Sequence, residues 1–176
     1  MGREGGRGQG PALIRTARLR LFRVSWSDAL ELAALKADPR IYGSMLGGVR
    51  SPIQAAHEAA AEVAFWGAHG VGMFAVRDLT GRLIGTTGIH QRPDGRGLAL
   101  RFAFDPASRG HGLAREAASA ALRYAHDRAG LPRVIAVARE DNVASRSVLG
   151  GIGMRHVDTF IRDRDVMMLY ESRRAG

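Results

Sequence analysis

A glycine-containing loop between a predicted strand and a predicted helix has the residue types most suited to binding a ligand. The strand ends at Phe104, and residues 109–112, Arg-Gly-His-Gly, lead into a helix that begins at Leu113. Glycine lets the backbone pass close to a ligand, and the free N–H groups and positive dipole end of a helix start attract anions. The loop therefore predicts a pyrophosphate site, with a tight strand-to-helix turn as the alternative. It is not a P-loop, because no Gly-Lys-Ser or Gly-Lys-Thr follows.

Alternating apolar and polar residues predict the elements that hold this loop. Strands are expected over residues 17–24, 73–77, 83–91, 98–104, 134–138, 157–161 and 166–170. Helices are expected from Ser25 to about residue 38, from the Ser51 capping box to about Gly67, over 113–129 and over 142–150. The three strands between residues 73 and 104 predict an antiparallel meander, and residues 41–50 an irregular segment. The order is that of one mixed α/β domain over residues 13–172, between a disordered Gly/Arg-rich tail (1–12) and a short tail (173–176).

The composition limits the possible functions. The chain has 176 residues, a net charge of +9 and no cysteine, which excludes disulfides, thiol nucleophiles and Cys-ligated metals. The basic residues are 25 arginines and Lys36, a skew that indicates a genome-wide coding bias toward arginine. The positive net charge fits general basicity, a phosphate-bearing ligand or nucleic acid. No apolar run is long enough to span a membrane, and the N-terminus lacks the apolar core of a signal peptide, so a cytoplasmic protein is expected. The histidines lack ligand spacing, so no metal is predicted.

Two blocks of the sequence follow one another in a fixed order. The first is Arg109-x-x-Gly112-x-Ala114, and the second is Asn142-x-x-Ser145-x-x-Val148 followed by Gly153-Met154. Together they resemble the motifs of the GNAT acetyltransferases, and in particular of the RimJ/RimL-type ribosomal-protein N-acetyltransferases. The opening segment 16–21 and the Asp38-Pro39 pair are also similar to that branch, so the resemblance covers roughly residues 16–171. It implies an α/β (α+β) GNAT fold with a mixed, mostly antiparallel central sheet, splayed in the middle and flanked by helices.

The resemblance also implies that acetyl-coenzyme A binds in the cleft of the splayed sheet. The residues expected to hold it are Phe102, Ala103, Phe104, Arg109, Gly110, His111, Gly112, Leu113, Ala114 and Asn142. Ser145 is implied as the donor to the departing thiolate, and its alternative role is local, as the third position of a helix that Asn142 caps.

The position expected to hold the proton acceptor differs from the family pattern. Ala99 stands where the branch often has a glutamate, and Arg101 and Phe102 stand where it has Gly and Tyr. His90, late in the preceding strand, could take the proton of an amine because imidazole titrates near neutral pH, or it could be a structural histidine. No general base is therefore assigned.

The acceptor is expected to enter beside the connection of the first two helices. Tyr42 and Met45 in this Gly-rich stretch are candidate substrate contacts, with core packing as the alternative. The predicted activity is direct transfer of acetyl from acetyl-coenzyme A to a primary amine, either a ribosomal or other protein N-terminus or a small amine. The rival functions are a non-catalytic acyl-coenzyme A sensor and, more weakly, nucleic-acid binding. An exposed edge strand near the C-terminus could form a homodimer.

Overall fold

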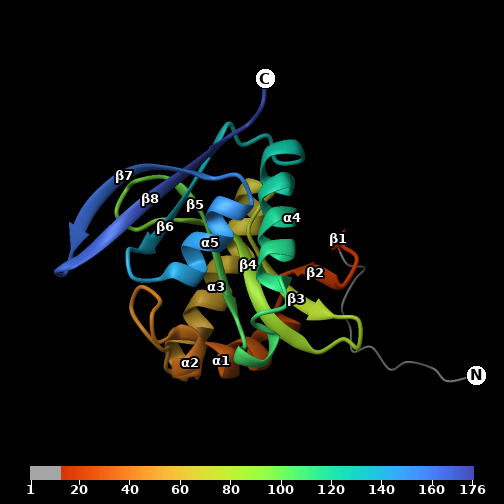
Figure 1. The fold of residues 1–176 in the computed structure, drawn as a ribbon. Helices are drawn as coiled ribbons and strands as arrows, with labels where there is room; N and C mark the ends of the chain where they lie inside the picture. Colours follow the sequence, from red (N-terminus) through yellow and green to blue (C-terminus); the bar gives the residue numbers. More distant parts are fainter. Residues whose placement is uncertain (1–12) are drawn as a thin grey trace, which may run out of the picture.

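The computed structural model describes residues 13–176, which form one eight-stranded sheet with the order β1-β2-β3-β4-β5-β6-β8-β7 (Figure 1). The predicted tail of residues 1–12 lies outside the described residues. The strands are β1 (Ile14–Arg15), β2 (Leu19–Arg23), β3 (Met73–Asp78), β4 (Leu83–Gln91), β5 (Leu98–Phe104), β6 (Arg133–Arg139), β7 (Arg155–Arg162) and β8 (Asp165–Arg173).

The sheet is splayed at its centre. All neighbouring strands pair antiparallel except β5 and β6, which run parallel and share a single register pair, Ala99 with Ile135. Beyond that pair the two strands diverge. The mixed, mostly antiparallel, splayed sheet flanked by helices and the meander β3-β4-β5 are therefore confirmed.

Helices cover both faces of the sheet (Figure 1). The helices α1 (Ala29–Ala37), α2 (Pro39–Tyr42) and α3 (Pro52–His69) lie on one face, and α4 (Leu113–Asp127) and α5 (Val143–Gly151) lie on the other. Successive side chains of β5 point to opposite faces of the sheet, so the strand contributes to the packing on both faces. Leu100 and Phe104 pack into the core with α4, whereas Ala103 packs with Tyr42 of α2.

The start of α3 is fixed by its sequence. The Gln54 N–H donates to Ser51 Oγ (3.2 Å), and the Ser51 N–H donates to Gln54 Oε1 (2.9 Å), with Pro52 in the first turn. This is the predicted capping box. The helix ends at Gly70, whose φ of +64° is accessible to glycine at little cost. It runs two residues past the predicted end at Gly67.

Four segments differ from the sequence prediction. The short strand β1, which pairs with β2, was not predicted. The 3₁₀ turn Trp26–Asp28 precedes α1, so the α-helix begins later than Ser25. Residues 39–42, partly predicted as irregular, form α2 because Asp38 Oδ1 caps the Arg40 N–H at 2.8 Å. The last two strands are longer than predicted because β7 is a polar, exposed edge strand without a strong apolar pattern.

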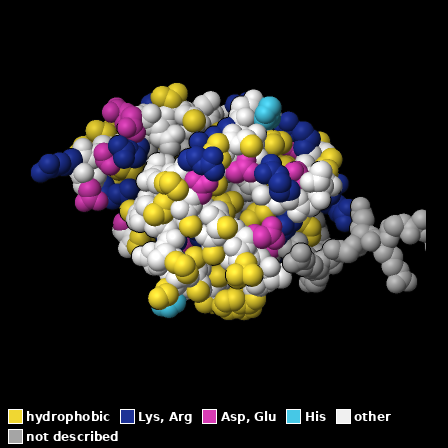
Figure 2. All heavy atoms as spheres, turned by 90° about the horizontal axis from the view of Figure 1, so that it is seen from below, with side chains coloured by type: hydrophobic (Ala, Val, Ile, Leu, Met, Phe, Trp, Pro, Cys, Tyr) yellow, Lys and Arg dark blue, Asp and Glu magenta, His cyan; other side chains and the backbone are white. Residues whose placement is uncertain are grey.

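On the face viewed from the side of α1 and α2, several basic side chains lie next to acidic ones (Figure 2). The ion pairs at the protein surface include Arg40–Asp38 (2.6 Å) and Arg82–Asp105 (2.8 Å). Exposed pairs of this kind contribute little to stability. Among residues 13–176, no helix is long and apolar enough to cross a bilayer.

Candidate functional site

The divergence of β5 from β6 opens a cavity of about 730 Å³, a size typical of ligand and cofactor sites. Its walls come from residues 100–104 of β5 and 136–139 of β6, with α3 on one side and the start of α5 on the other. Beyond Ala99, the backbone groups of β5 that face this gap have no strand partner, because their ladder to β6 has ended. A ligand with amide groups along an extended arm would supply the missing hydrogen bonds. The cleft therefore fits the pantetheine arm of coenzyme A.

The glycine loop lies where β5 leads into α4. Gly110 has a φ of +79°, and Gly112, the N-cap residue of α4, has a φ of +75°. Side chains other than glycine adopt such angles only at a cost, so both glycines are needed for the shape of the loop. A chain that turns this way leaves the first N–H groups of α4 free of intrahelical partners. The loop can therefore bind an anion through its backbone.

Arg18 and Glu116 fasten this loop to the start of β2. Arg18 Nη1 donates to the carbonyl oxygen of His111 (2.8 Å), and Arg18 Nε donates to Glu116 Oε2 (2.7 Å). The other carboxylate oxygen of Glu116 accepts from the Arg18 N–H (3.0 Å) and from Thr16 Oγ1 (2.5 Å). Although burial opposes the charged form, these bonds from Thr16 and Arg18 hold the pKa of Glu116 below its ordinary value.

Arg109 has a structural contact in addition to its place at the cleft. Its Nη2 donates to the carbonyl oxygens of Arg40 (2.6 Å) and Phe104 (3.3 Å), which joins the loop to α2. The predicted cofactor residues that line the cavity are Phe102, Ala103, Phe104, Arg109, Ala114 and Asn142. The other four are outside the lining: Gly110, His111 and Gly112 lie in the loop, and Leu113 is the first residue of α4.

The helix start at Asn142 presents a free hydroxyl to the cavity. Asn142 Oδ1 accepts the Ser145 N–H at 3.1 Å, so the cap uses the backbone of Ser145 and not its side chain. Ser145 Oγ forms no hydrogen bond with any described residue, and both Asn142 and Ser145 line the cavity. The capping role and the predicted donor role are therefore compatible, since they use different atoms.

His90 lines the cavity from β4, where it pairs in register with Ala99. Burial lowers the pKa of its imidazole to about 3, and the positive charges of Arg101 and Arg92 contribute to this shift. The side chain is therefore neutral at pH 7. An imidazole with so low a pKa is a weak proton acceptor, because a general base works best with a pKa near the operating pH.

The two predicted substrate contacts are separated by the structure. Met45 lines the cavity. Tyr42 does not, because its side chain is fully buried and packs with Leu35, Ile41 and Ala103. Its packing role is therefore the one that the structure supports.

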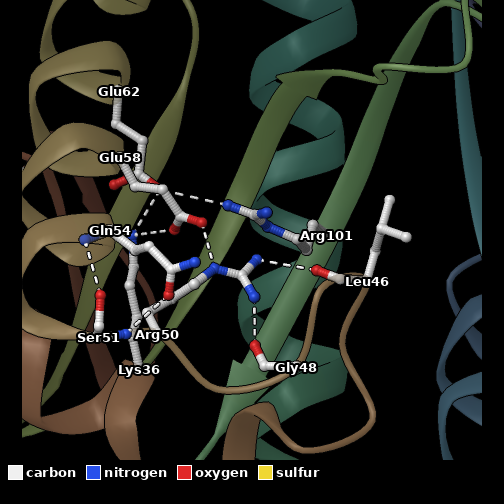
Figure 3. Close-up of polar contacts among 9 residues, drawn as sticks. All are labelled: Lys36, Leu46, Gly48, Arg50, Ser51, Gln54, Glu58, Glu62 and Arg101. Atoms are coloured by element: carbon white, nitrogen blue, oxygen red, sulfur yellow. Dashed lines mark hydrogen bonds and ion pairs between the residues drawn. The ribbon is translucent and has the colours of Figure 1, made fainter.

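A buried charge network on α3 was not singled out from the sequence (Figure 3). Lys36 lies on α1, and its side chain is only 1% exposed. Its Nζ donates to Glu58 Oε2 (2.9 Å) and to Glu62 Oε1 (3.0 Å). Arg50 binds the other oxygen of Glu58, and Arg101 Nη2 donates to Glu62 Oε1 at 3.2 Å. The signal in the sequence was the four-residue spacing of the two glutamates, which places them on one helix face. Both glutamates line the cavity.

Lys36 remains charged in this network although it is buried. Desolvation alone would lower the pKa of its ammonium group, but the carboxylates of Glu62 and Glu58 outweigh burial and raise that pKa above its ordinary value. No cluster of three or more His, Cys, Asp or Glu side chains able to hold a metal ion occurs within residues 13–176.

Comparison with known proteins gives one matching family model, described as an acetyltransferase (GNAT) domain, over residues 18–155. A curated relative, the FsC-acetyl coenzyme A-N(2)-transacetylase of Aspergillus fumigatus, is 41% identical over 64 residues, which are 36% of this chain and 27% of that protein. The match thus spans about a quarter of the relative.

Solved structures share the fold over most of their length. A GNAT-family acetyltransferase from Bordetella pertussis has a TM-score of 0.80 at 25% identity, with 92% of this chain and 98% of that chain covered. An acetyltransferase from Agrobacterium tumefaciens has a TM-score of 0.80 at 26% identity, covering 98% and 100%. An acetyltransferase from Salmonella typhimurium that modifies the N-terminal serine of ribosomal protein L7/L12 has a TM-score of 0.74 at 15% identity, covering 90% and 96%. At that identity the last likeness concerns the fold alone.

Proposed function

Because this chain belongs to the GNAT acetyltransferase family, we propose that it transfers the acetyl group of acetyl-coenzyme A to a primary amine, in a complex that holds both substrates. The observation that carries this proposal is the cavity between β5 and β6, whose wall contains unpaired backbone of β5, the loop residue Arg109 and the free hydroxyl of Ser145. The acceptor is a protein N-terminus, as in the ribosomal-protein branch that the sequence resembles, or a small amine.

The chain's own residues divide the binding of coenzyme A between two elements. The N–H groups around Gly110 and Gly112 bind the pyrophosphate, and the Arg18–Glu116 pair keeps the loop in place. The backbone of residues 102–104 binds the amides of the pantetheine arm, next to Asn142. When bound, acetyl-coenzyme A supplies an activated acetyl thioester.

Ser145 assists the leaving group. Its hydroxyl has no hydrogen-bond partner among residues 13–176, and Ser145 lines the cavity, so the hydroxyl can donate a hydrogen bond to the sulfur as negative charge develops there. The amine must attack in its neutral form. His90 has a pKa of about 3, so its imidazole is too weak a base to remove the proton of an ammonium group. The pKa of the acceptor amine therefore sets how the rate rises with pH.

Two measurements on the full chain test the proposal. Calorimetry gives the affinity for acetyl-coenzyme A, and thiol release with a panel of amines and N-terminal peptides gives turnover. Binding with amine-dependent thiol release is expected. Tight binding without turnover over the whole panel would overturn catalysis in favour of a non-catalytic acyl-coenzyme A sensor, and absence of binding would overturn both.

A further inference from the structure

Arg101 carries a positive charge into the half of the cleft that faces α3. Its side chain leaves β5 on the side opposite to Leu100 and Phe104, which pack with α4, and its Nη2 reaches Glu62 of α3 at 3.2 Å (Figure 3). The glycine loop leads into α4 on the other face of the sheet. Arg101 is therefore directed away from the predicted pyrophosphate site.

Buried groups fix the position of this guanidinium. Glu62 is only 10% exposed and holds Arg101 with the same oxygen that accepts from Lys36 (3.0 Å). Lys36 is in turn held by Glu58, and Glu58 by Arg50. A long side chain anchored in this way loses little additional freedom when it binds a ligand, which favours tight and selective binding.

The network has more positive than negative charge. Lys36, Arg50 and Arg101 supply three cations, and the two glutamates supply two carboxylates. One positive charge is thus left without a counter-charge in the network. Arg101 also has spare donors: its Nε is buried without a hydrogen-bond partner, and its Nη1 forms no hydrogen bond with a described residue.

A partly desolvated cation with unused donors is stabilised by an anion that reaches it. The pKa of His90 is lowered first by burial and next by the charges of Arg101 and Arg92, which agrees with the excess of positive charge at this end of the cleft. The planar guanidinium matches the geometry of a carboxylate, which can accept two of its hydrogen bonds at once.

We propose that Arg101 binds a carboxylate of the acceptor close to the amine that is acetylated, and so selects acceptors in which a carboxylate lies near a primary amine. This inference rests on the proposed acetyl transfer to an amine. The carboxylate comes from one of two sources, the α-carboxylate of a free amino acid or the acidic side chain of an N-terminal peptide, and both present the same chemistry to Arg101.

Matched acceptor pairs test the selection in the wild-type protein. Glycine is compared with glycinamide, and the dipeptide amide Gly-Asp-NH₂ with Gly-Asn-NH₂, with putrescine as a purely cationic amine. Each kcat/KM is expressed per concentration of unprotonated amine, because a carboxylate and an amide leave the neighbouring amine with different pKa values. Because a charge-assisted bidentate contact is lost in the amide member, this corrected kcat/KM is expected to fall by about 10- to 100-fold within one pair. The pair that shows the fall identifies the source of the carboxylate, and equal kcat/KM within both pairs would overturn the inference.

Substitutions then assign the selection to Arg101. Arg101→Gln is expected to remove the difference within the selective pair and to leave the affinity for acetyl-coenzyme A unchanged in calorimetry. Arg101→Lys retains the charge and the contact with Glu62 but loses the two parallel donors of the guanidinium. It should therefore keep part of the difference in kcat/KM within the selective pair. Arg155→Gln is the control, because it removes the same charge from an exposed residue outside the cavity lining.

The outcomes separate this inference from the proposed function. Selection that persists in Arg101→Gln, or is lost equally in Arg155→Gln, would overturn the role of Arg101 while acetyl transfer stands. If the wild type acetylates none of these acceptors and none of the wider panel of amines, the proposed activity is overturned and the inference with it. If Arg101→Gln fails to fold, as circular dichroism would show, Arg101→Lys and the wild-type pairs still decide.

Discussion

Lowering the pH from 7 to 5 should destabilise this protein through the buried side chain of His90. In the folded chain the pKa of His90 is about 3, and its ordinary value is 6.5. The folded state therefore stays neutral at this site down to about pH 3, whereas the unfolded state takes up a proton below pH 6.5. Stability contributed by the neutral imidazole is present above pH 6.5 and is lost as the pH falls.

The size of the effect follows from proton linkage. At pH 5 the unfolded histidine is almost fully protonated and the folded one is not, so the free energy of unfolding falls by about 2 kcal/mol relative to pH 7. The cause is burial first, then the charges of Arg101 and Arg92, with Asp94 acting weakly in the opposite direction. Carboxylates with lowered pKa, such as Glu116, lose their contribution at lower pH and affect this interval little.

Urea denaturation at pH 7 and at pH 5 measures the effect as a difference between variants. The wild type should lose about 2 kcal/mol more than His90→Gln over this interval. His57→Gln, at an exposed position, is the matched control and should behave as the wild type does. If His90→Gln lost as much stability as the wild type between the two pH values, burial of a neutral His90 would be refuted.

Four further substitutions test the site and the packing of the sheet. Ser145→Ala should lower kcat at saturating substrates and change the free energy of unfolding by less than about 0.5 kcal/mol, because its hydroxyl has no protein partner; an unchanged kcat would refute the donor role. Asn142→Ala should cost about 1 kcal/mol in denaturation experiments, since it removes the helix cap. Gly112→Ala should cost about 1 kcal/mol and weaken acetyl-coenzyme A binding in calorimetry, because alanine resists a φ of +75°; unchanged affinity would refute the loop site. Gly88→Ala should cost roughly 2–3 kcal/mol in the same denaturation assay, since its Cβ would overlap the Gly72 carbonyl oxygen, and a neutral effect would contradict that close approach.

Local patterns in the sequence were sufficient for most of the elements. The capping box at Ser51 placed the start of α3, and the apolar alternation between residues 73 and 104 placed the meander, because both depend on contacts between near neighbours along the chain. The loop at Gly112 was recognisable for the same reason. The exposed strand β7 was delimited less well, since an edge strand buries too little to show a clear pattern.

The sequence by itself thus determined the family, the order of the strands and helices other than β1 and α2, and the loop that precedes α4. Only the tertiary structure decided which side chains share the cleft: it buried Tyr42 in the core, turned Arg109 toward the carbonyl of Arg40, and joined Lys36 to Glu62 and Arg101. The physical reason is that these contacts connect residues 26 to 69 positions apart. Their formation depends on how α1, α2 and α3 pack on the splayed sheet, and no local periodicity records that packing.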